Sequence, residues 1–252
     1  MDKLYHIGLD DSHGARYALL PGDPGRVEKI AAYLENPRYL GTNREYTTWL
    51  GELSGERVLV MSTGMGGPST AIGVEELYMT GVRTFIRIGT CGGMQTQVIG
   101  GDVVVANGAI RMEGTSKEYV PIEYPAISDF EVTTALVQAS KNLGKSWHVG
   151  VVQCKDSFYG QHQPERMPVA YELTDKWSAW VKAGCLASEM ESAALYAVCS
   201  VLRARAGCVL HVVWNQERVK AGLSNPTTHD TTGVIQVAVE AVRLLIKEER
   251  SV

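Results

Sequence analysis

The chain has 252 residues, of which 45% are hydrophobic and 21% are charged, and its formal net charge is -4. This composition is typical of a globular protein with one sizeable core, so we expect a single domain over residues 1–252. Lys and Arg are nowhere concentrated and no apolar run approaches the length of a membrane helix, so we expect neither nucleic acid nor a membrane as a partner. Scattered cysteines and a first segment without the apolar centre of a signal peptide predict a cytoplasmic location.

Apolar runs rich in β-branched residues alternate with helical patterns along the chain. In chain order, strands are expected near residues 17–20, 58–62, 84–88, 103–106, 149–152 and 209–214. Pro68 suits the first turn of a helix that runs to about Thr80, and apolar residues spaced by three and four predict a final helix over residues 234–245. Residues 160–168 form the least regular stretch. The alternation predicts an α/β fold in which helices cover a largely buried sheet.

Four short islands combine glycine or a turn with reactive side chains: residues 21–26, 62–69, 87–92 and 188–192. The glycines expose backbone N–H groups near strand ends, where α/β sheets bind ligands. Arg26, Arg87 and Thr90 add hydrogen-bond donors for phosphate oxygens. In the fourth island, the Glu191 carboxylate would repel phosphate but suits a diol such as that of ribose. No island matches a nucleoside triphosphate loop, and Ser69 stands where a dinucleotide fingerprint needs its third glycine. Phosphate beside ribose predicts phosphorolysis or hydrolysis of a nucleoside.

The same islands carry a family resemblance. Through ordered matches at residues 5–9, 21–24, 44–49, 63–69, 87–90, 156–159 and 189–191, the chain resembles the nucleoside phosphorylase family over essentially its full length, and most of all its uridine phosphorylases. The resemblance implies a three-layer α/β/α subunit with a central mixed sheet. It also implies a homo-hexamer, built as a trimer of dimers, whose active sites are shared between two subunits. The implied reaction is reversible phosphorolysis of uridine and deoxyuridine to uracil and ribose 1-phosphate or its deoxy form, in pyrimidine salvage.

The resemblance also assigns residues to the parts of the site. For phosphate it implies Gly22, Arg26, Arg87 and Thr90, with Arg44 reaching in from the neighbouring subunit. For ribose it implies Thr90, Met190 and Glu191, with His6 contributed in trans. No cofactor is required, although a structural potassium ion at the dimer interface is implied by Glu45, the backbone oxygen of Met65, and Ser69.

The base pocket departs from the family pattern. Phe158 is expected to stack on the base, and the Gln161 amide can donate to a uracil oxygen while accepting from N3–H. The Arg that usually follows this Gln by two residues is missing, and three donors are candidates to replace it: His162, Arg166 and Lys155. We expect Lys155 and His162, because an anionic leaving group in a dry pocket favours a nearby cation.

The chemistry explains why such residues are needed. Phosphate attacks C1′ while the C–N bond breaks, so positive charge develops on the sugar and negative charge on the uracil, with no covalent enzyme intermediate. The expected catalytic residues are Arg87, Glu191, Lys155 and His162. Glu191 is favoured over Glu189, because a carboxylate two residues away points elsewhere on either a strand or a helix.

Other functions are disfavoured by particular residues. The resemblance implies that a purine nucleoside phosphorylase uses an Asp after the late strand. This chain has Trp214, Asn215, Gln216 and Glu217 there, and a neutral amide is a poor acid. A nucleosidase uses water and has no need of Arg26, Arg44 and Arg87. A non-catalytic sensor on the same scaffold would show no phosphate-dependent cleavage. The remaining histidines are dispersed, which predicts no metal catalysis, and Trp and Tyr residues are expected to serve packing and subunit contacts.

Overall fold

The structure is a computed structural model and describes residues 2–251. Its ten strands form one sheet. The strands are β1 (Tyr17–Pro21), β2 (Glu35–Asn43), β3 (Tyr46–Leu53), β4 (Glu56–Met61), β5 (Thr84–Gly93), β6 (Val103–Met112), β7 (Ala126–Ile127), β8 (Trp147–Lys155), β9 (Ala187–Glu189) and β10 (Arg205–Asn215). The helices are α1 (Val27–Ala31), α2 (Gly67–Met79), α3 (Thr115–Tyr119), α4 (Phe130–Asn142), α5 (Phe158–His162), α6 (Ala170–Lys182), α7 (Ser192–Leu202), α8 (Gln216–Lys220) and α9 (Thr232–Glu249), with short 3-10 turns at Asp11–His13, Pro24–Arg26 and Pro164–Arg166.

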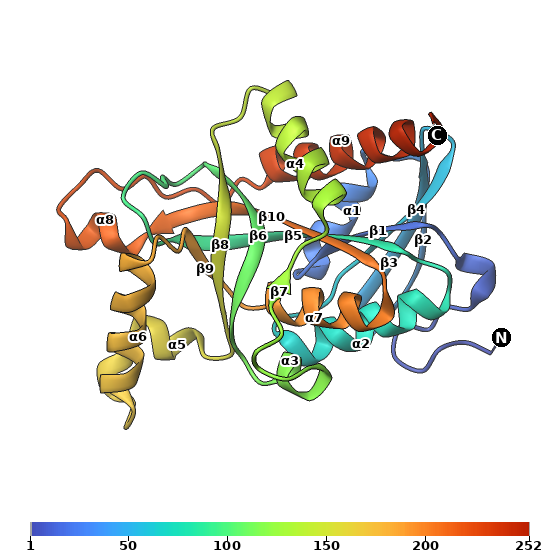
Figure 1. The fold of residues 1–252 in the computed structure, drawn as a ribbon. Helices are drawn as coiled ribbons and strands as arrows, with labels where there is room; N and C mark the ends of the chain where they lie inside the picture. The colour runs from blue at the N-terminus through green and yellow to red at the C-terminus, as the bar shows by residue number, and fades with distance from the viewer. Residues whose placement is uncertain (1, 252) are drawn as a thin grey trace.

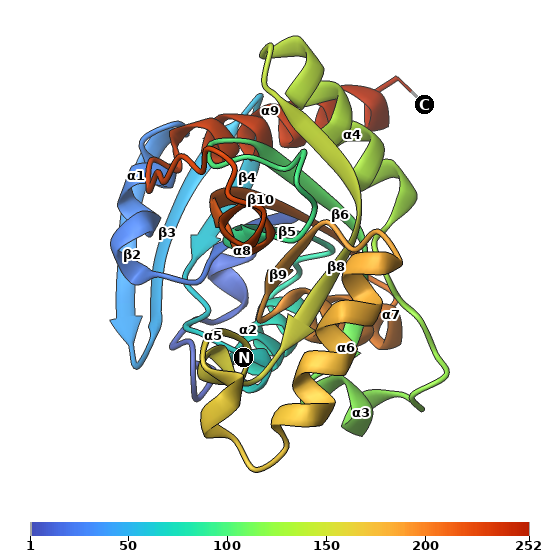
Figure 2. The same cartoon turned by 90° about the vertical axis from the view of Figure 1, so that its left-hand side faces the viewer.

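The sheet is mixed and partly closed. Its strand order is β10-β6-β8-β9-β5-β1-β4-β3-β2, and β10 also pairs with β5, so the five strands from β10 to β5 form a ring. β5 runs parallel to β10 from the pair Thr84–Arg205 to the pair Gly93–Asn215, whereas β6 runs antiparallel to β10. This pairing brings the carboxyl ends of β5 and β10 to the same place. Figure 2 views the ring from the end that carries α5, α6 and α8.

Helices cover both faces of the sheet, as Figure 1 shows. One core cluster joins α2 and α7 to one face through residues such as Val74 and Leu195, and another joins α1, α4 and α9 to the opposite face through residues such as Leu136 and Val242. The expected three-layer α/β/α fold with a central mixed sheet is therefore confirmed. No helix within residues 2–251 is long and apolar enough to cross a membrane.

The expected elements are present, and most are longer than predicted. α2 begins after Gly66, whose φ of 92° suits glycine, and Pro68 lies in its first turn. The final helix buries the predicted apolar residues but extends from Thr232 to Glu249. The expectation that residues 160–168 are irregular is partly wrong, because α5 and a 3-10 turn occupy most of this stretch. The Ser157 hydroxyl accepts from the Gly160 N–H at 2.9 Å and so caps α5.

Candidate active site

A cleft of about 730 Å³ opens where β1, β5, β8, β9 and β10 end. Parallel strands of an α/β sheet place such clefts at their carboxyl ends. All four sequence islands contribute to it, although they are spread over the chain. The predicted site residues that line the cleft are Gly22, Arg26, Met65, Arg87, Thr90, Lys155, Phe158, Gln161, His162, Met190 and Glu191. The predicted residues that do not line it are His6, Arg44, Glu45 and Ser69.

Two arginines converge beside Gly22 at one end of the cleft. A Cβ atom on Gly22 would lie 3.8 Å from Arg87 Nη1 and 3.9 Å from Arg26 Nη2, so a side chain here would occupy the space between the guanidinium groups. Among the described residues, three buried side-chain polar atoms lack a hydrogen-bond partner, and two of them are Arg26 Nη1 and Arg87 Nη1. Burial and the charge of Arg87 lower the pKa of Arg26. Buried unpaired donors on two like charges favour an anion at this point.

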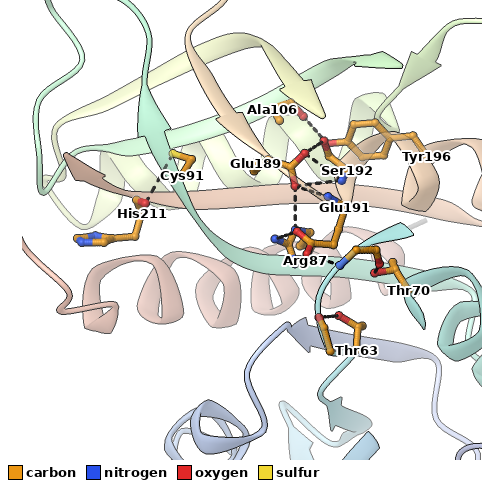
Figure 3. A network of polar contacts seen from close by, with 12 residues as sticks. Thr63, Thr70, Arg87, Cys91, Ala106, Glu189, Glu191, Ser192, Tyr196 and His211 are labelled. Carbon is orange, nitrogen blue, oxygen red and sulfur yellow. Dashed lines mark hydrogen bonds and ion pairs between the residues drawn. The ribbon is translucent and has the colours of Figure 1, made fainter. Parts of the chain in front are cut away.

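Arg87 also contacts two carboxylates at the start of α7, as Figure 3 shows. Its Nε donates to Glu189 Oε2 at 3.2 Å, and its Nη2 donates to Glu191 Oε2. Glu191 accepts a further bond from the Gly66 N–H at 2.7 Å. Burial raises the pKa of Glu191, while Arg87 opposes the shift and Glu189 adds to it. Arg87 therefore links the anion end of the cleft to Glu191, the carboxylate predicted to bind ribose.

The expectation that Glu189 points away from Glu191 is wrong. β9 ends at Glu189 and α7 begins at Ser192, so neither strand alternation nor helical spacing applies between the two carboxylates. Glu189 accepts from the backbone N–H groups of Glu191 and Ser192 at 2.9 and 3.0 Å, as well as from Arg87. Glu189 thus caps the helix that presents Glu191, and both carboxylates line the cleft.

The other end of the cleft holds the candidate base pocket. Lys155 ends β8, is only 5% exposed, and donates from Nζ to Ser188 Oγ at 2.6 Å. Burial lowers the pKa of Lys155, with Glu189 opposing the shift. Burial and then the charge of Lys155 lower the pKa of His162, whose ring centroid lies 4.3 Å from that of Phe158. An ammonium, an imidazole and an aromatic face are therefore adjacent.

Arg166, the third candidate for the base pocket, lies elsewhere. Its side chain is exposed on the 3-10 turn Pro164–Arg166 and bonds to Gln163 Oε1. It does not line the cleft. The loop instead directs His162 and Gln161 inward from α5.

His6 and Arg44 lie together on a different surface. Arg44 Nη2 is 3.4 Å from the Tyr5 hydroxyl, and the Tyr5 and His6 rings meet edge to face with centroids 4.8 Å apart. Glu76 accepts from the His6 backbone and contacts its Nδ1 at 2.5 Å. Figure 1 shows the N-terminus at the opposite end of the molecule from α5 and α6. Neither side chain reaches the cleft of its own chain.

The three residues expected at a potassium ion gather around Gly64. Ser69 Oγ donates to the Met65 carbonyl oxygen at 3.2 Å. A Cβ atom on Gly64 would lie 3.0 Å from Glu45 Cγ and 3.4 Å from Ser69 Oγ. A carboxylate, a carbonyl and a hydroxyl oxygen are the ligand types that hard cations prefer, so the residues fit such an ion.

Several residues that line the cleft are not among the predicted site residues, and Trp214 and His229 are two of them. Trp214 was expected to serve packing or subunit contacts and His229 to have no role, yet both line the cleft. The Trp214 ring lies 5.8 Å from that of His162. Its position at the end of the late strand was a usable signal, because strand ends meet ligands in this fold class. His229 follows in an irregular segment that offers no such signal.

Comparison with known proteins agrees with this geometry. The family model described as Phosphorylase superfamily matches residues 16–248. The chain belongs to this superfamily. It is 57% identical to the uridine phosphorylase of Treponema pallidum over 248 residues. These residues make up 98% of this chain and 96% of the relative. It is 42% identical to the uridine phosphorylase of Escherichia coli, over 96% of this chain and 98% of the relative. A guanosine phosphorylase of Halorubrum lacusprofundi is 39% identical over 85% of both chains. The resemblance to nucleoside phosphorylases is thus confirmed.

Proposed function

We propose that the protein catalyses the phosphorolysis of uridine, and of deoxyuridine, to uracil and ribose 1-phosphate or its deoxy form. The observation that carries the proposal is the pair of buried, unpartnered guanidinium nitrogens of Arg26 and Arg87, whose side chains converge beside Gly22 in a cleft that continues through Glu191 to Lys155. An enzyme that used water would have no use for these donors. The relatives named uridine phosphorylase support the choice of substrate.

The proposed mechanism assigns one task to each end of the cleft. Arg26, Arg87 and Thr90 hold phosphate with one oxygen directed at C1′ of the ribose. Glu191 accepts from the 2′ and 3′ hydroxyls, which fixes the sugar and favours its cationic character. Orientation of this kind contributes about 7–11 kcal/mol in ideal cases. As the phosphate oxygen bonds to C1′, the electron pair of the C1′–N1 bond passes to uracil, which takes up a proton on release.

The departing uracil anion is the second charge to be stabilised. Lys155 supplies a buried cation, and a well-placed donor to such an anion is worth about 3–4 kcal/mol. His162 adds a dipole, because its lowered pKa keeps the imidazole neutral near pH 7. Phe158 stacks on the base, and Met190 packs beside the ribose.

Asn215 at the end of β10 disfavours a purine nucleoside as the substrate. Asn215 donates from Nδ2 to the carbonyl oxygens of Gln95 and Val98, each at 2.7 Å, and accepts from the Arg218 N–H. Its amide is fully used inside the protein and is not available to protonate a purine.

The proposed active enzyme is a homo-hexamer, a trimer of dimers, in the cytoplasm. His6 and Arg44 support this assembly, because they cluster with one another but away from their own cleft. In the proposed dimer they complete the partner's ribose and phosphate sites, and Glu45, Met65 and Ser69 hold a structural potassium ion at the interface.

The test is uracil release from uridine with and without phosphate, with inosine as the comparison substrate. We expect uracil and ribose 1-phosphate only when phosphate is present, and little hypoxanthine from inosine. Equal uracil release without phosphate would refute phosphorolysis, and faster cleavage of inosine would refute the assignment of the base.

A further inference from the structure

A buried hydrogen-bonded group lies at the base end of the cleft, and Ser188 at its centre lines the cleft. Ser188 in β9 is 4% exposed and lies between a lysine and two glutamines. Its Oγ is 2.6 Å from Lys155 Nζ, 2.7 Å from Gln153 Oε1 and 2.8 Å from Gln161 Oε1. Of the three partners, Lys155 and Gln161 line the cleft. Ser188 therefore connects the buried cation to the amide that faces the base.

Lys155 determines the direction of the hydrogen bonds in this group. An ammonium can only donate, so Ser188 Oγ accepts from it and shares its single hydrogen between the Gln153 and Gln161 oxygens. In this arrangement the Gln161 amide turns its oxygen towards Ser188 and its Nε2 towards Gln216 Oε1, at 3.3 Å. The Gln161 oxygen keeps a second lone pair, and Nε2 keeps a second hydrogen, for a ligand.

The two orientations of a glutamine amide recognise different pyrimidine bases. Uracil offers an N3–H donor flanked by carbonyl acceptors, whereas cytosine offers an N3 acceptor beside an amino donor. An amide whose oxygen faces N3–H and whose nitrogen faces a carbonyl matches uracil. The reversed amide matches cytosine equally well, since both contacts change sign together.

We propose that Ser188 is a positioning residue that holds the Gln161 amide in the orientation for uracil and so excludes cytosine. The inference rests on the proposed function, because it assigns the base to the Gln161 end of the cleft. Removal of the Ser188 hydroxyl leaves Gln216 as the remaining hydrogen-bond partner of the Gln161 amide among the contacts described above. Gln216 is itself an amide, so both amides can rotate by 180° together and keep their hydrogen bond. Discrimination then falls because the reversed state becomes populated.

The test compares Ser188→Ala with the wild type in two readouts, turnover of uridine and cytidine and calorimetric binding of uracil and cytosine. We expect kcat/KM for uridine to fall about tenfold, mainly through KM, as for the loss of one buried hydrogen bond. The preference for uridine over cytidine, and for uracil over cytosine, falls by at least about tenfold. The KM for phosphate stays unchanged.

Two controls separate positioning from packing. Ser140→Ala removes an equally buried hydroxyl, which donates to the Leu136 carbonyl oxygen in α4, and should leave both preferences unchanged. In a Gln161→Ala background, Ser188→Ala should change the base preference no further, whereas a packing defect would add its effect to that of the first substitution. Thermal unfolding verifies that each variant is folded.

The outcomes distinguish this inference from the proposed function. A Ser188→Ala protein with wild-type base preference, or one with additive effects in the Gln161→Ala background, overturns the inference while phosphorolysis by the wild type stands. A wild type that does not cleave uridine, but binds uracil over cytosine through Ser188, overturns the function and keeps the inference. A wild type that binds neither base overturns both.

Discussion

Substitution of the two carboxylates that contact Arg87 should separate catalysis from stability. Glu191→Gln keeps an oxygen for the Gly66 N–H but removes the charge beside the ribose, while Arg87 retains Glu189 at 3.2 Å. Glu189→Gln removes the charge beside Arg87 and leaves one oxygen to accept from Arg87 and from the first N–H groups of α7. The two variants are isosteric and lie two residues apart, so each is a matched control for the other.

The structure gives the expected size of both effects. For Glu191→Gln, the loss of a charged hydrogen bond costs about 1.5–3 kcal/mol, but relief from burying a carboxylate offsets it, so the free energy of unfolding should change by less than about 2 kcal/mol. The loss of transition-state stabilisation is about 3–4 kcal/mol, which lowers kcat by about 10²–10³-fold. For Glu189→Gln, a broken buried ion pair and a weakened helix cap should lower the free energy of unfolding by about 3–5 kcal/mol.

The assays are steady-state uridine phosphorolysis and urea unfolding of the same preparations. We expect Glu191→Gln to be folded and nearly inactive, and Glu189→Gln to be less stable but active at temperatures where it stays folded. If Glu191→Gln kept more than about a tenth of the wild-type kcat, Glu191 would not be the ribose carboxylate. If Glu189→Gln lost activity without losing stability, the two roles would be exchanged.

Three further predictions test the remaining parts of the site. Lys155→Ala should lower kcat by about 10²–10³-fold with little change in phosphate binding, while Arg166→Ala should stay near wild type; the opposite result would place Arg166 at the base. Mixed oligomers of Arg44→Ala and Glu191→Gln subunits should regain part of the activity that each pure variant lacks, and verified mixed oligomers without recovery would rule out a shared site. The lowered pKa of His162 means that the unfolded chain binds a proton more readily, so the free energy of unfolding should fall as the pH drops below 6.5. His162→Gln should reduce that fall, and identical urea titrations of variant and wild type from pH 7 to 5 would contradict the assignment.

Much of the architecture and the identity of the cleft residues are determined by the sequence alone. Strand cores such as those of β1, β4 and β5 are apolar and fully buried, so their patterns are visible without knowledge of their neighbours. Gly22 is recognisable because it follows a buried strand, and Arg87 because it is a charged residue within the apolar run of β5. The hairpin strand β2 was not predicted, since its residues are largely exposed and carry no apolar pattern.

Other features depend on which segments meet in space, and only the tertiary structure decides them. Lys155 and Ser188 are hydrogen-bonded because β8 and β9 pair in a particular register, which local patterns do not encode. Trp214 enters the cleft because β10 runs beside β5, and Glu189 reaches Arg87 because the chain turns between β9 and α7. Local periodicity reports the burial of one segment at a time, whereas these contacts join segments that are far apart along the chain.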